Sequence, residues 1–305
     1  MKTIKTLSFI LLFGLLSISV FSQERQPIID MHMHIDAPLN LPAGAPAPCL
    51  PQPCVRQGHA SANSSDNLKK TLEEMDRYNI VKAFLSDLDP SELQEWAEAA
   101  PDRFIISFFI VDPAKAASPD ELRKELEAKR IGGIGEIGSQ LVGIAPNDAR
   151  LEPYFALAEE YDVPVLIHTE GIGPPIPSFR SAAGRPLLLE DVLVRHPKLR
   201  IFIENSGYPY LDEMIALMYQ YPQVYGDLST MTWIIPQSAF YDYLQRLMKA
   251  GLGKRLMFGS DQMRWPEMIG KGIEAVQNAD FLTDEQKRDI LYNNAVRFLH
   301  LDTKK

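Results

Sequence analysis

The feature of this sequence that most limits its fold is an alternation of short apolar runs with longer amphipathic runs between Pro27 and Leu299. The apolar runs are typical of strands buried on both faces, and the amphipathic runs are typical of helices that cover a parallel sheet. Ser91 is expected to be the N-cap of the second helix. The expected strands are residues 28–32, 80–85, 104–111, 131–137, 163–168, 199–203, 224–227 and 256–259. The expected helices are residues 67–78, 91–100, 119–129, 153–161, 187–195, 210–220 and 238–249, and more than one helix is expected within residues 267–299.

This pattern contains eight strand–helix units and no evident linker. Eight units in about 280 residues match the usual size of a (β/α)8 TIM barrel, so an α/β chain with one domain over residues 23–305 is predicted. A doubly wound open sheet is the structural alternative. No glycine-rich dinucleotide fingerprint follows the first strand, which argues against it. The glycines at 132, 133 and 135 lie inside an expected strand and therefore do not indicate a phosphate cradle.

Residues 1–22 have the pattern of a secretory signal peptide. Lys2 and Lys5 precede an apolar stretch over residues 7–21, and polar residues follow it. This stretch is shorter than the roughly 20 residues that a transmembrane helix needs. A cleaved signal predicts a periplasmic or secreted protein with no membrane span after removal of the signal; a retained N-terminal anchor is the alternative.

The two cysteines, Cys49 and Cys54, lie in a proline-rich stretch that cannot form a regular helix or a central strand. In an exported protein, two close cysteines more often form a disulfide than a metal site. A rigid loop held by a disulfide is therefore predicted, with thiolate ligands to a metal as the alternative.

The net charge of −9 argues against nucleic acid or an anionic membrane as the main partner. A small-molecule substrate is the expected partner, and the oligomeric state is open.

Candidate metal ligands follow four of the expected strands. In a (β/α)8 barrel, the catalytic groups come from the carboxyl ends of the strands. The period of two in a strand places the imidazoles of His32 and His34 on the same face. Imidazole nitrogens and carboxylate oxygens are the ligands that Zn²⁺ and similar ions favour. The other three strand ends carry Glu136, His168 and Asp261.

Each of these residues also has an ordinary interpretation. A single histidine at a strand end is more often a hydrogen-bonded polar residue than a ligand, and Asp261 could cap a helix. Their placement at independent strand ends favours a metal site. Of the other three histidines, His59 could line the pocket, while His196 and His300 are expected to face solvent or pack against helices.

The sequence resembles the amidohydrolase superfamily, and most closely the amidohydrolase-related branch that includes aminocarboxymuconate semialdehyde decarboxylase. This resemblance implies a divalent metal bound by His32, His34, His168 and Asp261. It also implies that Asp261 hydrogen-bonds the metal-bound water and takes its proton. The segments that carry the resemblance are residues 29–34, 165–169, 196–200, 221–229, 256–261 and 290–299.

Two positions depart from the pattern of this branch. A histidine usually ends the sixth strand, and Asn205 stands at that position, with Glu204 beside it. Asn205 could donate a hydrogen bond to a substrate carbonyl but cannot transfer protons. Glu204 could bind metal, act as a base or form an ion pair behind the site. Glu136 resembles a bridging carboxylate of other branches, so a second ion is open, although one ion is favoured.

The predicted activity is hydrolysis of a small ester, lactone or amide by a metal-activated water, with Zn²⁺ as the expected metal and Mn²⁺ as the alternative. An apolar pocket could be lined by Trp233, Trp265, Tyr208 and Phe179. A substrate carboxylate could be bound by Arg180 and Arg185. Two other functions remain: metal-dependent non-oxidative decarboxylation, as in relatives of this branch, and a catalytically silent barrel that serves as a binding protein.

Overall fold

The computed structural model describes residues 25–35, 60–173 and 177–301. Eight strands occupy the centre of the molecule, and every pair of neighbouring strands is parallel. They form two hydrogen-bonded groups, β1-β2-β3 and β4-β5-β6-β7-β8. The strands are β1 (Ile28–His34), β2 (Ile80–Asp87), β3 (Phe104–Phe108), β4 (Ile134–Ile137), β5 (Val165–His168), β6 (Ile201–Glu204), β7 (Val224–Asp227) and β8 (Leu256–Met257).

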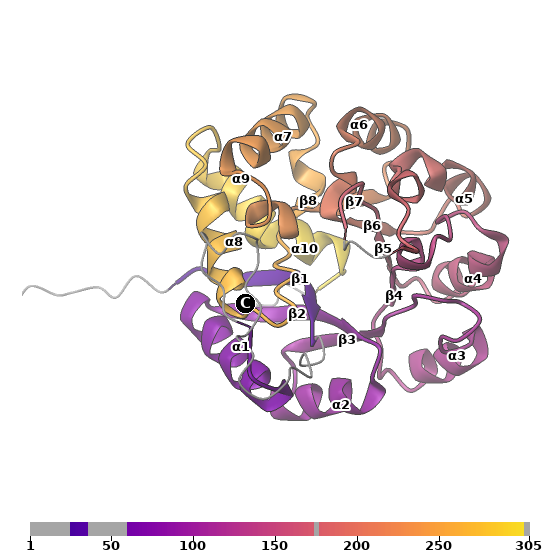
Figure 1. Cartoon of the computed structure of the whole chain (residues 1–305). Coiled ribbons are helices and arrows are strands. Elements are labelled where there is room, and N and C mark those ends of the chain that lie inside the picture. Colours follow the sequence, from indigo (N-terminus) through magenta and orange to yellow (C-terminus); the bar gives the residue numbers. More distant parts are fainter. Residues whose placement is uncertain (1–24, 36–59, 174–176, 302–305) are drawn as a thin grey trace, which may run out of the picture.

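Backbone hydrogen bonds at two seams close the strands into a ring. Between β3 and β4, the amide of Ile110 donates to the carbonyl of Glu136 at 2.7 Å. Between β8 and β1, the amide of Met31 donates to the carbonyl of Phe258 at 2.9 Å. The predicted (β/α)8 barrel is therefore confirmed, and Figure 1 shows the helices arranged around the strands.

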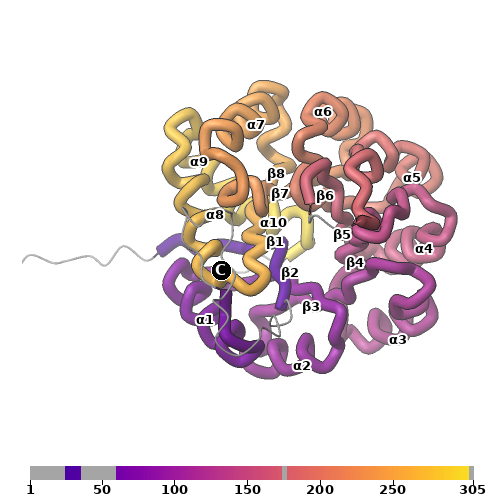
Figure 2. Tube along the Cα trace, viewed as in Figure 1, coloured from indigo at the N-terminus to yellow at the C-terminus, as the bar shows by residue number. Residues whose placement is uncertain are grey.

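The first eight helices surround the ring in chain order, and the last helix lies near its centre, as the trace in Figure 2 also shows. None of the helices in the described ranges is long and apolar enough to cross a membrane. The helices are α1 (Ser64–Tyr78), α2 (Pro90–Ala99), α3 (Pro119–Glu127), α4 (Glu152–Glu160), α5 (Glu190–Arg195), α6 (Leu211–Gln220), α7 (Gln237–Lys249), α8 (Glu267–Gln277), α9 (Asp284–Arg288) and α10 (Asn294–Phe298).

Some predicted boundaries were wrong. Asp89, not Ser91, caps α2: its carboxylate accepts from the Ser91 amide at 2.8 Å. Pro90 then occupies the first helical position, where its fixed φ is favourable and no amide hydrogen is needed. The helices expected within residues 267–299 are α8, α9 and α10, with a π-helical turn between α9 and α10.

The short helix α10 packs against the interior of the barrel. Its Phe298 belongs to a buried cluster with side chains of β1, β2, β5, β6 and β8, whereas the larger core lies between the strands and the outer helices. Met31 belongs to the interior cluster and Met33 to the larger core. The pairing of β1 with β2 shifts register between Asp30 and Met33, so the side chains change face within the segment that carries His32. Irregularities of this kind are frequent beside active sites, where they redirect a side chain.

Three predictions concern residues outside the described ranges: the signal peptide at residues 1–22, the disulfide between Cys49 and Cys54, and the position of His59. They remain predictions.

Candidate metal centre

His32 and His34 end β1, and their Nε2 atoms lie 3.0 Å apart. On the other side of each ring, Nδ1 contacts an acceptor. His32 Nδ1 is 2.8 Å from Asp227 Oδ2, and His34 Nδ1 is 2.9 Å from the carbonyl oxygen of Ser86. A carbonyl oxygen only accepts, so His34 carries its proton on Nδ1, and the Asp227 carboxylate favours the same tautomer for His32. Two neutral rings would therefore direct lone pairs at each other.

Glu136 of β4 brings a carboxylate to the same point. Its Oε2 lies 2.8 Å from His34 Nε2 and 3.5 Å from His32 Nε2. One ligand atom from each of these three buried residues falls within 4.8 Å of the others, which is a spacing that could hold a metal ion. Gly135 permits this approach: its φ is +114°, and a Cβ there would lie 2.2 Å from the carbonyl oxygen of Leu166.

Two further acids surround His32. Asp261 Oδ1 lies 3.7 Å from His32 Nε2 and 3.6 Å from His34 Nε2. Glu204 Oε1 lies 3.7 Å from His32 Nε2, and neither oxygen of this fully buried carboxyl has a hydrogen-bond partner among the described residues. A buried carboxylate without a partner is costly unless a cation or proton compensates it. Glu204 therefore lies where an ion could satisfy it.

His168 lies on the opposite side of Glu136. Its Nδ1 is 2.7 Å from Glu136 Oε1, and its Nε2 is 3.3 Å from Glu170 Oε1. The two oxygens of Glu136 thus face different histidines, with Oε2 toward His32 and His34 and Oε1 toward His168. The structure brings all the predicted ligands into one region, where Glu136 links His168 to the His32–His34 pair. His168 Nε2 is buried and has no hydrogen-bond partner among the described residues.

The charges of this region favour cations. Burial opposes protonation of both β1 imidazoles, but the surrounding carboxylates outweigh it. Glu204 and Asp261 raise the pKa of His32 well above its usual range, and Glu136 raises the pKa of His34 to about 9. Burial also raises the pKa of Asp261 to about 6. Because metal ligands must be deprotonated, a divalent ion would take the place of these protons. The donor set therefore fits a divalent metal.

Asn205 follows β6 in a left-handed conformation with φ of +59°. Its backbone amide donates to Asp227 Oδ1 at 2.6 Å. Its side-chain oxygen accepts from the hydroxyls of Ser229 at 2.7 Å and Thr230 at 2.9 Å. The side-chain nitrogen is buried and has no hydrogen-bond partner in the part of the chain that the structure describes. Asn205 thus retains a free donor at the end of the strand that carries Glu204.

Four residues contact the site although no role was predicted for them from the sequence: Asp227, Ser86, Glu170 and Asp30. Asp227 orients His32, and Asp30 Oδ1 accepts from the amides of His32 at 3.1 Å and Ser260 at 2.9 Å. Asp227 and Glu170 lie at or just after a strand end, and this position could have marked them as site residues in the sequence. Nothing in the sequence marks Ser86, because it contacts His34 through its backbone carbonyl.

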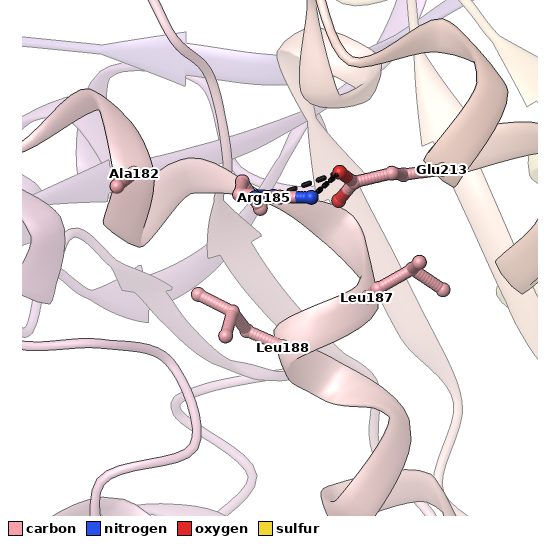
Figure 3. A pocket seen from close by; sticks show the side chains of 5 residues that line it. All are labelled: Ala182, Arg185, Leu187, Leu188 and Glu213. Atoms are coloured by element: carbon pink, nitrogen blue, oxygen red, sulfur yellow. Dashed lines mark hydrogen bonds and ion pairs between the residues drawn. The ribbon is translucent and has the colours of Figure 1, made fainter.

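Neither arginine considered for substrate binding has a free guanidinium. Arg185 pairs with Glu213, with Nε 2.7 Å from Oε1, beside a surface pocket of about 390 Å³ shown in Figure 3. Arg180 donates to the carbonyls of Pro177 and Phe179 at 2.7 and 2.8 Å. A substrate carboxylate would have to displace these contacts.

His196 is buried, as the helix-packing interpretation expected. Its Nδ1 lies 3.1 Å from Glu159 and its Nε2 lies 3.0 Å from Glu152, both on α4. Among the described residues, His196 has no contact with His32, His34 or Glu136. It connects the end of α5 to α4.

Several known proteins are similar to this chain. "Protein fluG" of Emericella nidulans is 24% identical over 154 residues, which are 46% of this chain and 18% of that protein. The chain therefore spans less than a fifth of that relative's length.

Three similar solved structures are each less than 25% identical to this chain, so they bear on the fold alone. An uncharacterized TIM-barrel protein from Bordetella bronchiseptica has a TM-score of 0.67 at 20% identity, over 90% of this chain and 99% of that chain. A probable 2-pyrone-4,6-dicarboxylic acid hydrolase from Acinetobacter baumannii, with citric acid bound, has a TM-score of 0.63 at 16% identity, over 90% and 99%. A 5-carboxyvanillate decarboxylase from Novosphingobium aromaticivorans, complexed with manganese and 4-hydroxy-3-methoxy-5-nitrobenzoic acid, has a TM-score of 0.54 at 17% identity, over 75% and 79%.

The amidohydrolase family pattern matches residues 29–301, nearly the whole of the described barrel. This match agrees with the resemblance noted in the sequence, and the chain belongs to the amidohydrolase family.

Proposed function

We propose that this amidohydrolase is a metal-dependent hydrolase of small esters, lactones or amides. The observation that carries the proposal is the meeting of His32 Nε2, His34 Nε2 and Glu136 Oε2, with each imidazole held by an acceptor at Nδ1. Without a cation or extra protons, the lone pairs of these groups would repel one another. Acceptors at the far nitrogen are the usual means by which a protein orients metal-binding histidines.

The proposed ligands are His32, His34 and Glu136, with Asp261 and His168 completing the set that the family resemblance implies. We propose one ion, because Asn205 stands where this branch usually has a further histidine at the end of the sixth strand. The two oxygens of Glu136 lie against different histidines, Oε2 against His34 and Oε1 against His168, and this arrangement would also suit two ions. The number of ions bound to each chain therefore tests whether the site holds one ion or two. Mixed nitrogen and oxygen donors suit both Zn²⁺ and Mn²⁺, and Zn²⁺ is the proposed metal.

A bound divalent ion would lower the pKa of water and polarise a carbonyl group. Asp261 lies 3.6–3.7 Å from both β1 imidazoles and is placed to accept a proton from the attacking water. It would then return that proton to the leaving group. Asn205 would donate its free amide hydrogen to the substrate carbonyl. Glu204 has two proposed roles, a further ligand or a second base, since its carboxyl lacks other partners.

The name of one structural neighbour supports the proposed substrate class. The Acinetobacter protein is named as a probable hydrolase of 2-pyrone-4,6-dicarboxylic acid, which is a cyclic ester that carries two carboxyl groups. Arg180 and Arg185 already have partners, so a substrate carboxylate that used these arginines would have to displace their contacts.

A combined metal and turnover experiment tests the proposal. The purified protein would be analysed for metal, then assayed with lactones, esters and amides in the presence of Zn²⁺ or Mn²⁺. We expect about one ion for each chain and hydrolysis that a chelator abolishes. Asp261→Asn should lose turnover while retaining metal. A protein that holds no metal after metal-replete expression would refute the proposal and favour a silent binding protein. Release of CO2 from an aromatic acid without hydrolysis would favour a decarboxylase.

We further propose that the protein is exported after cleavage of residues 1–22 and that Cys49 and Cys54 form a disulfide. The support is the sequence pattern alone. Mass spectrometry of the protein from fractionated cells, with and without reduction, tests both points. A cytoplasmic protein that retains Met1 would contradict export, and two alkylatable thiols would contradict the disulfide.

A further inference from the structure

The hydroxyl of Thr230 contacts the side-chain amide of Asn205. The side-chain oxygen of Asn205 receives hydrogen bonds from Thr230 Oγ1 and Ser229 Oγ. Ser229 has a single hydroxyl proton and also lies 2.9 Å from Asp227 Oδ1, which competes for it. Thr230 is therefore the steadier donor. All three residues are buried.

The backbone of Asn205 is fixed as firmly as its side chain. Asn205 and Ser206 both have positive φ, a conformation that residues other than glycine rarely adopt. Asp227 accepts a hydrogen bond from the backbone N–H of Asn205, and the Tyr243 hydroxyl donates to the carbonyl of Ser206 at 2.7 Å. Because the side-chain oxygen of Asn205 is occupied, the hydrogens of the side-chain nitrogen are left unused.

The unused nitrogen of the Asn205 side chain belongs to the residue that directly follows Glu204. Glu204 Oε1 lies 3.7 Å from His32 Nε2, and the Asn205 nitrogen is buried with no hydrogen-bond partner among the described residues. Because Thr230 donates to the side-chain oxygen of Asn205, the nitrogen is the end of this side chain that remains available to a ligand.

We propose that Thr230 is a positioning residue that makes Asn205 a hydrogen-bond donor to the substrate carbonyl oxygen. This inference rests on the proposed hydrolysis. It restricts the substrates to those whose carbonyl oxygen gains negative charge during the reaction, because such an oxygen attracts the donor most in the transition state. A loss of Thr230 should therefore lower kcat more than it raises KM.

Two variants separate the hydroxyl from the shape of the side chain. Thr230→Val keeps the shape and removes the donor, and Thr230→Ser keeps the donor. With a chromogenic acetate ester and δ-valerolactone as probes, we expect Thr230→Val to lose roughly tenfold to a hundredfold in kcat, less than the loss of a direct donor of this kind. Thr230→Ser should retain the wild-type kcat. Metal content should be unchanged in both.

A second measurement does not depend on turnover. In a sample labelled with ¹⁵N at asparagine, the side-chain signals of Asn205 are assigned by their absence in Asn205→Asp. We expect these signals to shift in Thr230→Val and to keep their wild-type positions in Thr230→Ser. Unchanged signals in Thr230→Val would overturn the inference. A wild-type protein without hydrolysis would overturn the proposed function instead, and a hydrolase whose Thr230→Val variant keeps full kcat would overturn only the inference.

Discussion

Replacement of Asp227 by asparagine should weaken metal binding although Asp227 is not a proposed ligand. One oxygen of this buried carboxylate accepts from His32 Nδ1 at 2.8 Å, and the other accepts from the amide of Asn205 at 2.6 Å. An asparagine side chain has one oxygen, so its NH2 group would face one of these two donors. A buried donor without an acceptor costs about 1–3 kcal/mol.

Because about 1.4 kcal/mol corresponds to a tenfold change in an equilibrium constant, this loss predicts a metal affinity lower by roughly 10-fold to 100-fold. The same range is typical when the acceptor behind a metal-binding histidine is removed. Competition with a fluorescent chelator at fixed pH measures the affinity directly.

Asp289→Asn is the matched control. Asp289 is a buried carboxylate that pairs with Lys254, and the described residues show no contact between it and His32, His34 or Glu136. It should lower the unfolding temperature without changing the metal affinity. An Asp227→Asn variant that folds and binds metal as tightly as the wild type would refute the assigned role of Asp227.

Three further predictions concern stability and turnover. Gly135→Ala should destabilise the protein by about 3–5 kcal/mol in urea unfolding, since its positive φ and a carbonyl oxygen 2.2 Å from the new Cβ add strain and overpacking. Gly251→Ala has a positive φ but no atom within 4 Å, so it should cost only about 1–2 kcal/mol, and equal losses at both positions would contradict this reasoning. Phe202→Ala in the barrel interior should cost about 3–5 kcal/mol by the same measurement, whereas Val194→Ala, 65% exposed on α5, should change stability by less than about 0.5 kcal/mol. Asp261→Asn should reduce kcat at saturating metal while the metal content stays at the wild-type value; a variant with wild-type kcat would exclude Asp261 as the proton acceptor.

The order of strands and helices could be predicted because most strands are buried on both faces and most helices bury one apolar side. Boundaries were less accurate where a cap decides them. At α2, the sequence Asp89-Pro90-Ser91 offers two residues able to cap, and the preference of proline for the first helical position selects Asp89. The register shift between Asp30 and Met33 has no local sequence signal, since it depends on pairing with β2.

The residues of the candidate site could be predicted from the sequence where their position at a strand end is enough to bring them together. His32, His34, Glu136, Glu204 and Asp261 gather because parallel strands end at the same edge of the barrel. The orientation of each imidazole was not predictable, because it depends on contacts between distant residues. His32 is oriented by a residue 195 positions later, and His168 lies against one oxygen of Glu136 and not beside the β1 pair.

The seam between β1 and β8 links the site to the last stages of folding. The Asp261 amide donates to the His32 carbonyl at 2.7 Å, and Ser260 is held by Asp30, 230 positions earlier in the chain. Contacts of such long range are expensive in loop entropy and tend to form late. His32 and Asp261 therefore become neighbours only when the two ends of the barrel sequence meet. During refolding, metal uptake should follow the formation of helices, and its rate would report the closure of the ring.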